Sequence, residues 1–398
     1  MRSLPLSLSF CFLFALTACG DEKQQQEEAT VQEPVENESQ DAPIASESVP
    51  IDENTEYTHE VVVPELQIPW GMTFLPDGSM LITEKSGELI HFSNGQKQQV
   101  QGVPEVYVRG QGGLLDVVLH PEYESNGWIY LTYASSEGEG EGGHTALART
   151  KLENGQLVDT EVLYKATPNT TAGQHFGSRI VFDEKGDLYF TIGERGNEHE
   201  NPQDITRDGG KVYRLNDDGS VPGDNPFSGE EEGIDAIYSY GHRNPQGMIV
   251  HPETGEVWVH EHGPMGGDEI NVVEKGANYG WPEVTYGIDY DGSTISDETT
   301  GPDYEAPIFY WVPSIAPSGM VFVTSDKYPE LQGDLLVGSL KFQYVEHLEL
   351  EGKEVVGRHK LLEGIGRIRD IRQGPDGFIY ISAEGLGIVK LLPKSSAE

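Results

Sequence analysis

The sequence predicts an all-β fold, a six-bladed β-propeller, and three observations lead to this prediction. The chain of 398 residues is rich in turn formers, with 48 Gly and 24 Pro. Its apolar residues come in short runs broken by turn residues, and no long amphipathic helical pattern interrupts them. One local pattern also recurs six times along the chain.

The recurring pattern is Pro or Asp, a short polar turn that usually holds an acidic residue, Gly, and then a strand. The six copies are 76–78 before 80–83, 121–127 before 128–131, 183–186 before 188–191, 252–255 before 257–259, 329–333 before 335–337, and 375–377 before 378–381. Such a hairpin cannot bury both of its faces alone, so six of them are expected to stack radially. A double β-sandwich is the alternative, but it does not require the same hairpin six times. Because the loops at one end of a propeller converge on its ligand site, we expect functional residues between these strands.

The N-terminus predicts a lipoprotein signal peptide over residues 1–18. Arg2 supplies a positive start, and residues 4–15 form an apolar run too short to span a bilayer. Residues 16–19 resemble a bacterial lipobox, which implies cleavage before Cys19 and attachment of lipid to its thiol. The alternative is an ordinary cleaved signal followed by a coincidental cysteine. We therefore expect an anchored protein of the cell envelope, in the outer membrane, with its body facing the periplasm.

Residues 19–56 are predicted to be a lipidated cysteine followed by a disordered acidic linker, and residues 57–398 to be the propeller. The linker is rich in Gln, Glu, Pro, Asn and Ser and holds almost no large apolar residue. Such a composition cannot bury enough surface to offset the entropy lost on ordering. The folded domain is expected to begin near Tyr57, just before the apolar run 61–63.

Charge and cysteine content exclude several classes of function. The chain carries 26 Lys and Arg against 67 Asp and Glu, for a formal net charge of −41. This charge argues against nucleic acid or anionic lipid as a partner, so membrane contact is expected only through the lipid on Cys19. Cys11 and Cys19 are the two cysteines, so the mature body has no disulfide, cysteine metal site or cysteine nucleophile.

Two segments between predicted strands offer groups for proton transfer and for binding. In 109–116, glycines let the backbone approach a ligand, and Gln111 offers both a donor and an acceptor. In 173–179, His175 is the best candidate for a general base, because neutral imidazole can take a hydroxyl proton near neutral pH. A plain glycine turn and a structural histidine are the alternatives at these two places.

A second set of residues predicts a site for an anion. Its members are Arg243, Asn244, Lys341, Arg367 and Arg369. In a strand, Arg367 and Arg369 project on the same side, and two adjacent guanidinium groups repel unless an anion lies between them. Together the set describes a pocket for a polycarboxylate or a phosphate. The alternative is pairing with local carboxylates, with Asp370 as the first partner for the two arginines.

The segment 260–282 contains candidate metal ligands. His260 and His262 would share one face of a strand, which allows a zinc or copper pair, although no third ligand of that type is near in sequence. The remaining Gly, Asp, Glu and Asn residues suit a hard cation such as calcium better. A solvated acidic turn is the alternative.

Taken in order, these motifs resemble the soluble aldose sugar dehydrogenases that depend on pyrroloquinoline quinone (PQQ), the glucose/sorbosone dehydrogenase-like propellers. The resemblance covers about 61–392. The motifs that carry it are 111–115, His175 with 177–179, 240–247, 262–264, 268–271, 278–282, 316–318, 339–341 and 367–370.

The resemblance implies roles for individual residues. His175 would remove the proton of the anomeric hydroxyl while hydride passes to the quinone, with Gln111 and Arg243 beside it. Glu194 stands where glucose-preferring members tend to carry Asp, which bears on the tuning of His175. The resemblance assigns PQQ to Arg243, Asn244, Lys341, Arg367, Arg369 and Trp311, the calcium on PQQ to Gly263 and Pro264, and a nearby structural calcium to Glu269 and Tyr279.

The function implied is oxidation of aldoses at C1 to lactones, with electrons passed to an unidentified acceptor, by a monomer or homodimer. A calcium-dependent propeller lactonase is one alternative. It would need a metal ringed by carboxylates on the axis, and it leaves Lys341, Arg367 and Arg369 unexplained. The other alternative is a propeller that binds a partner without catalysis.

Overall fold

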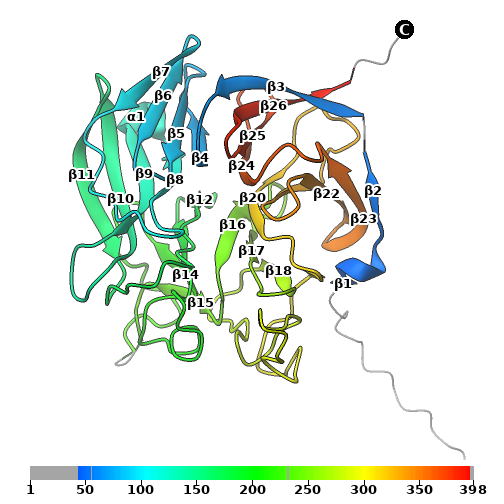
Figure 1. Ribbon diagram of the computed structural model, residues 1–398. Coiled ribbons are helices and arrows are strands. Elements are labelled where there is room, and N and C mark those ends of the chain that lie inside the picture. Colours follow the sequence, from blue (N-terminus) through cyan, green and yellow to red (C-terminus); the bar gives the residue numbers. More distant parts are fainter. Residues whose placement is uncertain (1–43, 55, 231–232, 395–398) are drawn as a thin grey trace, which may run out of the picture. The chain divides into compact units, whose positions relative to one another are not determined.

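The computed structural model describes residues 44–54, 56–230 and 233–394, and this part of the chain folds into six β-sheets. Figure 1 shows the sheets arranged around a common centre, with the first strand of each sheet lying innermost. The predicted all-β, six-bladed propeller is confirmed.

Each of the first three sheets is built from four consecutive strands. The first holds β4 (Pro69–Phe74), β5 (Met80–Glu84), β6 (Leu89–Ser93) and β7 (Gln96–Val100). The second holds β8 (Leu114–Leu119), β9 (Trp128–Ser135), β10 (His144–Glu153) and β11 (Gln156–Lys165). The third holds β12 (Ile180–Phe182), β13 (Leu188–Ile192), β14 (Lys211–Leu215) and β15 (Ile237–Tyr240).

The last three sheets each include a strand from the N-terminal part of the fold. The fourth holds β16 (Pro245–Val250), β17 (Val257–Glu261), β18 (Asp268–Val272), β19 (Phe309–Trp311) and, at its edge, β1 (Ile44–Ala45). The fifth holds β20 (Pro317–Phe322), β21 (Leu335–Ser339), β22 (Val345–Glu351), β23 (Glu354–Leu361) and the edge strand β2 (Ile51–Glu53). The sixth holds β24 (Ile368–Gln373), β25 (Ile379–Ala383), β26 (Gly387–Pro393) and β3 (Tyr57–Pro64).

The six predicted hairpins are the first hairpins of the six blades, and each predicted strand overlaps the second strand of its sheet. The turn between β4 and β5 shows why this pattern recurs. Gly78 has φ +82°, a conformation that a residue with a Cβ adopts only with strain. The carboxylate of Asp77 accepts a hydrogen bond from the backbone N–H of Ser79 at 2.9 Å. Asp and Gly are therefore used for the turn itself, and the apolar run that follows is free to pair.

The blades close into a ring because each inner strand contacts the inner strands on both sides: β4, β8, β12, β16, β20, β24 and again β4. Each junction between neighbouring blades also has its own core. Leu81 of the first blade packs with Leu131 of the second, for example, and Met248 of the fourth packs with Val212 of the third. A blade thus buries both faces only by contacting two neighbours, which is the physical reason for radial stacking.

The structure corrects the predicted start of the fold. Residues 44–54 belonged to the predicted disordered linker, but β1 pairs in parallel with β19 and β2 pairs in parallel with β23. Between them lies the 3-10 helix η1 (Ser46–Ser48), where the Ser46 hydroxyl donates to Val312 O at 3.2 Å and accepts from Val312 N at 3.0 Å. Arg358 donates to the carbonyls of Ser46 and Val49. Backbone pairing, which needs no apolar side chains, orders this segment along the outer edges of two blades (Figure 1).

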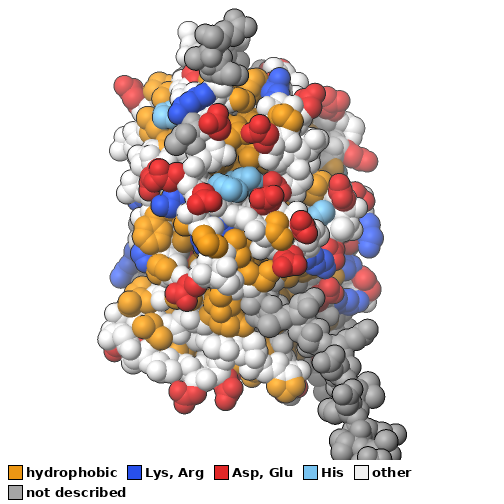
Figure 2. All heavy atoms as spheres, turned by 90° about the vertical axis from the view of Figure 1, so that its right-hand side faces the viewer, with side chains coloured by type: hydrophobic (Ala, Val, Ile, Leu, Met, Phe, Trp, Pro, Cys, Tyr) orange, Lys and Arg blue, Asp and Glu red, His pale blue; other side chains and the backbone are white. Residues whose placement is uncertain are grey.

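The predicted signal peptide, Cys19 and most of the linker lie outside the described residues. Within the described residues, the one α-helix is α1 (Tyr123–Asn126), and no helix is long and apolar enough to cross a membrane. Figure 2 shows the face on the side of β1 and β2, where acidic side chains are scattered widely.

Candidate active site

The connections that carry the predicted site residues are hydrogen-bonded to one another. Gln111 N donates to Gly173 O at 2.7 Å, and the Gln111 side chain accepts from His175 N at 2.8 Å. Glu194 N donates to Arg243 O at 2.9 Å, which joins the third and fourth blades. These bonds place Gln111, His175, Glu194 and Arg243 at one end of the propeller.

His175 is paired with Glu194, and this pairing fixes its tautomer. The Nδ1 atom of His175 contacts Glu194 Oε1 directly, and the two side chains are 12% and 1% exposed. Glu194 also accepts from the backbone N–H of Asn197 at 2.9 Å. An ionised carboxylate can only accept, so Nδ1 carries the proton and donates it. The Nε2 atom of neutral His175 is therefore left with a lone pair, as a general base requires.

Burial lowers the pKa of His175 below its ordinary value of 6.5. Glu194 opposes this shift, and the positive charges of Arg243 and Arg195 add to it. His175 is therefore a neutral base at neutral pH.

The backbone around this pair adopts conformations that side chains normally disfavour. His175, Ser178 and Arg195 have φ values of +56°, +91° and +63°. Such positions are held only where surrounding contacts determine them, and they cluster at functional sites. Gly193 lies among them, where a Cβ would meet His175 O at 2.5 Å and Asn244 Oδ1 at 2.6 Å. Glycine is thus required for the close approach of the His175 and Asn244 segments.

Arg243 and Asn244 are buried beside this pair and are incompletely hydrogen-bonded. The Nη1 atom of Arg243 donates to His262 O at 3.1 Å and to Gly263 O at 3.0 Å. Its Nε atom and Asn244 Nδ2 have no partner within the described residues, although the two side chains are only 5% and 1% exposed. A buried donor without a partner costs about 1–3 kcal/mol. Both unsatisfied donors suit a ligand that accepts hydrogen bonds.

Arg367 and Arg369 share one carboxylate instead of an anion between them. Arg367 Nε and Arg369 Nε donate to the two oxygens of Glu384, at 3.1 and 2.6 Å. Arg369 is 14% exposed and Arg367 46% exposed. The two arginines therefore pair with a carboxylate of the chain, as the alternative expected, but this carboxylate belongs to Glu384 and not to Asp370.

Lys341 is exposed, but its turn is tied to the same cluster. Arg367 Nη1 donates to Leu340 O at 3.1 Å, and Lys341 N donates to Ile315 O at 3.1 Å. The Lys341 ammonium lies 5.1 Å from the centre of the Phe342 ring. The structure therefore places the Lys341 backbone beside the arginines while its side chain is free to move.

The charges that act on His262 show that Arg243, Arg369 and His175 lie near one another. Burial, together with smaller contributions from Arg243, His175 and Arg369, lowers the pKa of His262 to about 3. The Nε2 atom of His262 lies 2.5 Å from Pro317 O. Residues from blades three, four and six are thus brought together around one histidine.

A small cavity with two carboxylates lies next to Arg243. It measures about 10 Å³, and Glu261, Glu269, Gly263 and Tyr279 are among the residues that line it. This volume holds about one water-sized particle. Burial, together with the negative charge of Glu261, raises the pKa of Glu269 well above its ordinary value. A cation between the two carboxylates would remove this conflict, although the described residues hold no cluster of three acidic, His or Cys ligands.

The carbonyl of Gly263 fits a cation less well. It accepts from Arg243 Nη1 at 3.0 Å, so a positive guanidinium already occupies one side of it. Pro264 lies beside it, buried. A calcium ion on these two carbonyls would require Arg243 to turn away.

The structure corrects the role of Trp311. Its side chain is fully buried in the core between the fourth and fifth blades, edge-on to Phe309 at 4.9 Å. Its indole N–H donates to Glu346 at 3.1 Å. Strand β19 turns this side chain into the core, so it has no free ring face for a cofactor.

Three charged residues near the site were not predicted. Glu384 holds the two arginines, Glu261 accepts from Arg243 N at 2.5 Å, and Lys85 donates to Gly110 O at 2.9 Å. Burial lowers the pKa of Lys85, and Arg369 contributes to the shift. All three lie at or next to the end of the second strand of a blade, as His260 and His262 do in the fourth blade.

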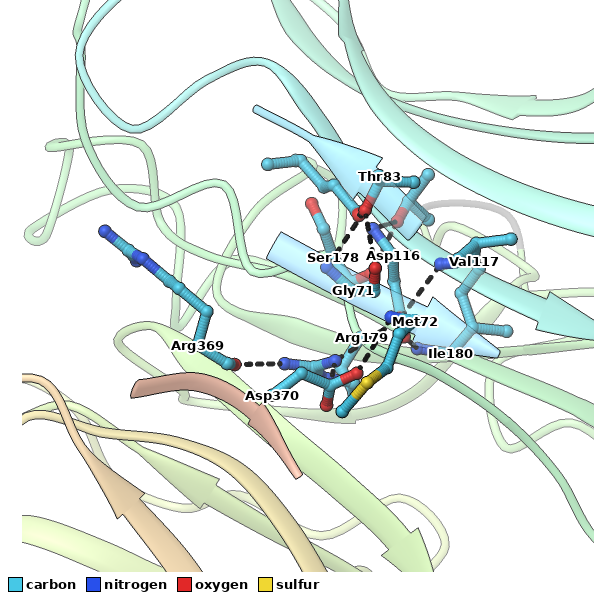
Figure 3. Close-up of polar contacts among 12 residues, drawn as sticks. Gly71, Met72, Thr83, Asp116, Val117, Ser178, Arg179, Ile180, Arg369 and Asp370 are labelled. Atoms are coloured by element: carbon cyan, nitrogen blue, oxygen red, sulfur yellow. Dashed lines mark hydrogen bonds and ion pairs between the residues drawn. The ribbon is translucent and has the colours of Figure 1, made fainter. Parts of the chain in front are cut away.

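Beneath the site, a separate ion cluster links five blades along the axis. Arg179 Nη1 donates to Asp116 at 3.2 Å and to Asp370 at 2.9 Å, and Arg372 bonds the same two aspartates at 3.0 Å each. The backbone N–H groups of Met72 and Ile180 donate to these carboxylates, and Arg179 Nε donates to Gln246 O. Figure 3 shows Arg179 between the aspartates, with its Nη2 bond to the Arg369 carbonyl, while the Arg369 guanidinium points away from the cluster.

The chain is similar to known proteins over nearly the whole propeller. The sequence model of the family described as Glucose / Sorbosone dehydrogenase matches residues 66–389. Aldose sugar dehydrogenase YliI of Escherichia coli is 42% identical over 347 residues, which cover 84% of this chain and 93% of that protein. Quinoprotein glucose dehydrogenase B of Acinetobacter calcoaceticus is 29% identical over 61% of this chain and 56% of its own length.

Solved structures agree with these relatives. The soluble aldose sugar dehydrogenase of Escherichia coli in its apo-form has a TM-score of 0.80 and 39% identity, covering 85% of this chain and all of that one. The PQQ-bound aldose sugar dehydrogenase of Streptomyces coelicolor has a TM-score of 0.69 and 26% identity, covering 85% of this chain and 99% of that one. The chain belongs to the glucose/sorbosone dehydrogenase family and is an oxidoreductase of the sugar dehydrogenase type.

Proposed function

We propose that this protein oxidises aldose sugars at C1 to the corresponding lactones, with PQQ as cofactor and calcium as its metal. The observation that carries the proposal is the neutral His175, whose Nδ1 atom is committed to Glu194 while the buried donors of Arg243 and Asn244 lie unsatisfied beside it. A base and a set of anion-binding donors at one place are what a tricarboxylate quinone and a sugar hydroxyl require together.

Five residues would hold the cofactor. Arg243 and Asn244 would use the donors that now lack partners, and Arg369, with Arg367 at its exposed side, would bind a carboxylate in competition with Glu384. Lys341 would contribute from the neighbouring turn, whose Leu340 carbonyl accepts from Arg367. When bound, PQQ supplies the acceptor for the two electrons of the sugar C–H bond.

The protein's own residues would handle the proton. The Nε2 atom of His175 takes the proton of the anomeric hydroxyl, and the imidazolium that forms is stabilised by Glu194 through Nδ1–H. Gln111 holds the backbone of His175 in place through the His175 N–H. Glu194, longer by one carbon than Asp, reaches His175 directly in this chain.

Calcium is proposed at the cavity between Glu261 and Glu269, with Tyr279 in its wall, and the Gly263 and Pro264 carbonyls remain candidates for a second ion. Hard oxygen ligands suit calcium, and burial together with the charge of Glu261 raises the pKa of Glu269, which a cation between the two carboxylates would reverse. Binding there would stabilise the segment that carries Trp281, over whose ring Arg243 lies at 5.2 Å.

Reconstitution tests the proposal. Purified protein with calcium and PQQ should reduce an artificial dye when an aldose is added, and should be inactive when PQQ is omitted. The spectrum of PQQ should shift on addition of protein and shift less in the presence of a calcium chelator. A protein that leaves the PQQ spectrum unchanged, or that hydrolyses lactones without PQQ, would overturn the proposal.

We also propose that Cys19 carries a lipid and anchors the protein in the cell envelope, facing the periplasm. The lipobox-like residues 16–19 support this. Cells that produce the full chain should incorporate labelled fatty acid into the wild type and not into Cys19→Ala. Equal labelling of both proteins would contradict the anchor.

A further inference from the structure

A second cavity lies between the second and third blades, in the part of the chain that the structure describes. It measures about 550 Å³, within the range of small-ligand pockets. Its walls come from the connection after β9, the segment after β11 and the loop that joins β13 to β14. Arg195 lies in its wall, directly after Glu194 in the sequence.

His144 is one of the buried residues that line this cavity. The side chain is 2% exposed, and Thr145 N donates to its Nδ1 atom at 2.9 Å. Nδ1 therefore accepts, and the proton of the neutral ring must be on Nε2. Among the described residues, Nε2–H has no hydrogen-bond acceptor. Burial, reinforced by Arg195, keeps the pKa of His144 well below its ordinary value, so the ring stays neutral.

Arg195 adds further unsatisfied donors in the same wall. It is 1% exposed, and its Nη2 atom donates to Gly143 O at 3.3 Å and Ala172 O at 2.7 Å. Its Nε and Nη1 atoms have no partner within the described residues. The guanidinium stacks 3.4 Å above the centre of the Phe176 ring, so no carboxylate is paired with it there. Burial lowers its pKa to about 10.

The opposite side of the cavity provides acceptors. Asp204 and Asp208 line it, and Glu139 is exposed there. Asp208 accepts from Tyr164, Thr167 N and Tyr213, and Asp204 accepts from Thr206. Arg195 and Arg207 also line the cavity, so its wall offers donors and acceptors with little net charge. A ligand rich in hydroxyl groups can accept from the donors and donate to the carboxylates. The wall therefore fits a neutral polyol or sugar ring.

The cavity is joined to the proposed catalytic pair by direct hydrogen bonds. Asn197 and Asn201 line it, and Asn197 N donates to Glu194 Oε2 at 2.9 Å while Asn201 Nδ2 donates to Glu194 O at 3.0 Å. We infer that this cavity binds a sugar ring or a similar polyol, and that its occupation changes the position of Glu194 behind His175. The binding part stands on its own, whereas the coupling to Glu194 rests on the proposed function.

Calorimetry of the apo-protein tests binding without any turnover. The probes are trehalose, which has no free anomeric hydroxyl, and maltose, which has one. Thr206 is exposed in the cavity wall and lies outside the catalytic pair, so Thr206→Trp should fill the cavity and weaken binding at least tenfold. Thr206→Ser keeps the hydroxyl that bonds Asp204 and should bind like the wild type. Failure of the wild type to bind either probe, or equal binding by Thr206→Trp, overturns the site.

Rates of the PQQ-loaded enzyme then separate two sources of the bound ring. If the ring is the far end of the substrate, Thr206→Trp raises KM for maltose several-fold and leaves glucose oxidation unchanged. If it is a separate sugar, trehalose changes the rate of glucose oxidation in the wild type and not in Thr206→Trp. Binding that affects neither rate overturns the coupling to Glu194. An absence of all dehydrogenase activity contradicts the proposed function and leaves the calorimetric result intact.

Discussion

The axial cluster around Arg179 and the site cluster around Arg243 are both buried and charged, but only the first is complete. Each of the three guanidinium nitrogens of Arg179 has a partner: two aspartates for Nη1, Gln246 O for Nε and Arg369 O for Nη2. In the site cluster, Arg243 Nε and Asn244 Nδ2 have none among the described residues.

The difference separates stability from binding. Buried charges that are fully paired join blades across the axis, and they become costly only when one partner is removed. Buried donors without partners reduce stability in the free protein, so their presence indicates a ligand that satisfies them. Arginine therefore serves stability in the axial cluster and binding in the site cluster. The two clusters differ in whether every guanidinium nitrogen of the arginine has a hydrogen-bond partner.

Removing Arg179 should have the largest effect, because it leaves Asp116 and Asp370 buried with less positive charge around them. We expect Arg179→Leu to lower the free energy of unfolding by about 3–5 kcal/mol, measured by urea denaturation. Lys353→Ala breaks an exposed ion pair with Glu256 and should cost about 1 kcal/mol or less. Equal losses in the two variants would contradict a structural role for the axial cluster.

Removing the proposed base should abolish most turnover without loss of cofactor. We expect His175→Ala to lower kcat by about 10²–10⁴-fold, the usual contribution of a general base, while the PQQ spectrum still shifts on binding. His199, which is 78% exposed, provides the control, and His199→Ala should keep its full rate. Turnover within threefold of the wild type in His175→Ala would remove His175 from this role.

Arg367 and Arg369, which both pair with Glu384, differ in exposure, so their variants test how strongly each contributes to PQQ binding in the site cluster. Arg369 is 14% exposed and Arg367 46% exposed, so a carboxylate bound by Arg369 is better shielded from water. Arg369→Ala should weaken PQQ binding by about 1.5–3 kcal/mol, whereas Arg367→Ala should cost about 1 kcal/mol or less. Spectroscopic titration measures both, and the reverse order would show that the cofactor lies on the exposed side.

Acid should destabilise the fold through buried neutral histidines, of which His260 is the clearest. Burial keeps its pKa well below 6.5 in the folded state. The unfolded chain therefore binds a proton that the folded one does not, so stability is full above about pH 6.5 and falls as pH drops below it. We expect His260→Leu to remove up to about 1.4 kcal/mol per pH unit from this slope. Urea denaturation from pH 7.5 to 5 checks it, and an unchanged slope would contradict the assignment.

The sequence predicted the propeller well because turn chemistry is local. Asp77 and Gly78 act within one turn, so a short polar turn that ends in Gly predicts a hairpin wherever it recurs in the six blades. Gln111, His175 and Arg243 were expected in connections that meet at one end of the propeller, and hydrogen bonds join these connections there, while the roles of the three residues remain predictions. The prediction that Trp311 binds the cofactor was wrong, because the direction of its side chain depends on the strand that pairs with β19.

The edge segment 44–54 was missed for a related reason. Its apolar content is low, and its order comes from parallel backbone pairing with β19 and β23, which no composition reveals. Glu384 and Lys85 were missed because a charged residue at a strand end is common, and only its spatial neighbours give it a role.

By itself, the sequence determined the repeated hairpin, the absence of cysteine chemistry in the body and the residue types available for an anion and a base. The tertiary structure alone decided which charges meet. Arg179 satisfies Asp116 and Asp370 from different blades, while Arg243 Nε, near His175, has no partner in the part of the chain that the structure describes. The physical reason is distance along the chain: hydrogen bonds within a turn are fixed by neighbouring residues, whereas those between blades join residues such as Met72 and Asp370, which are 298 positions apart.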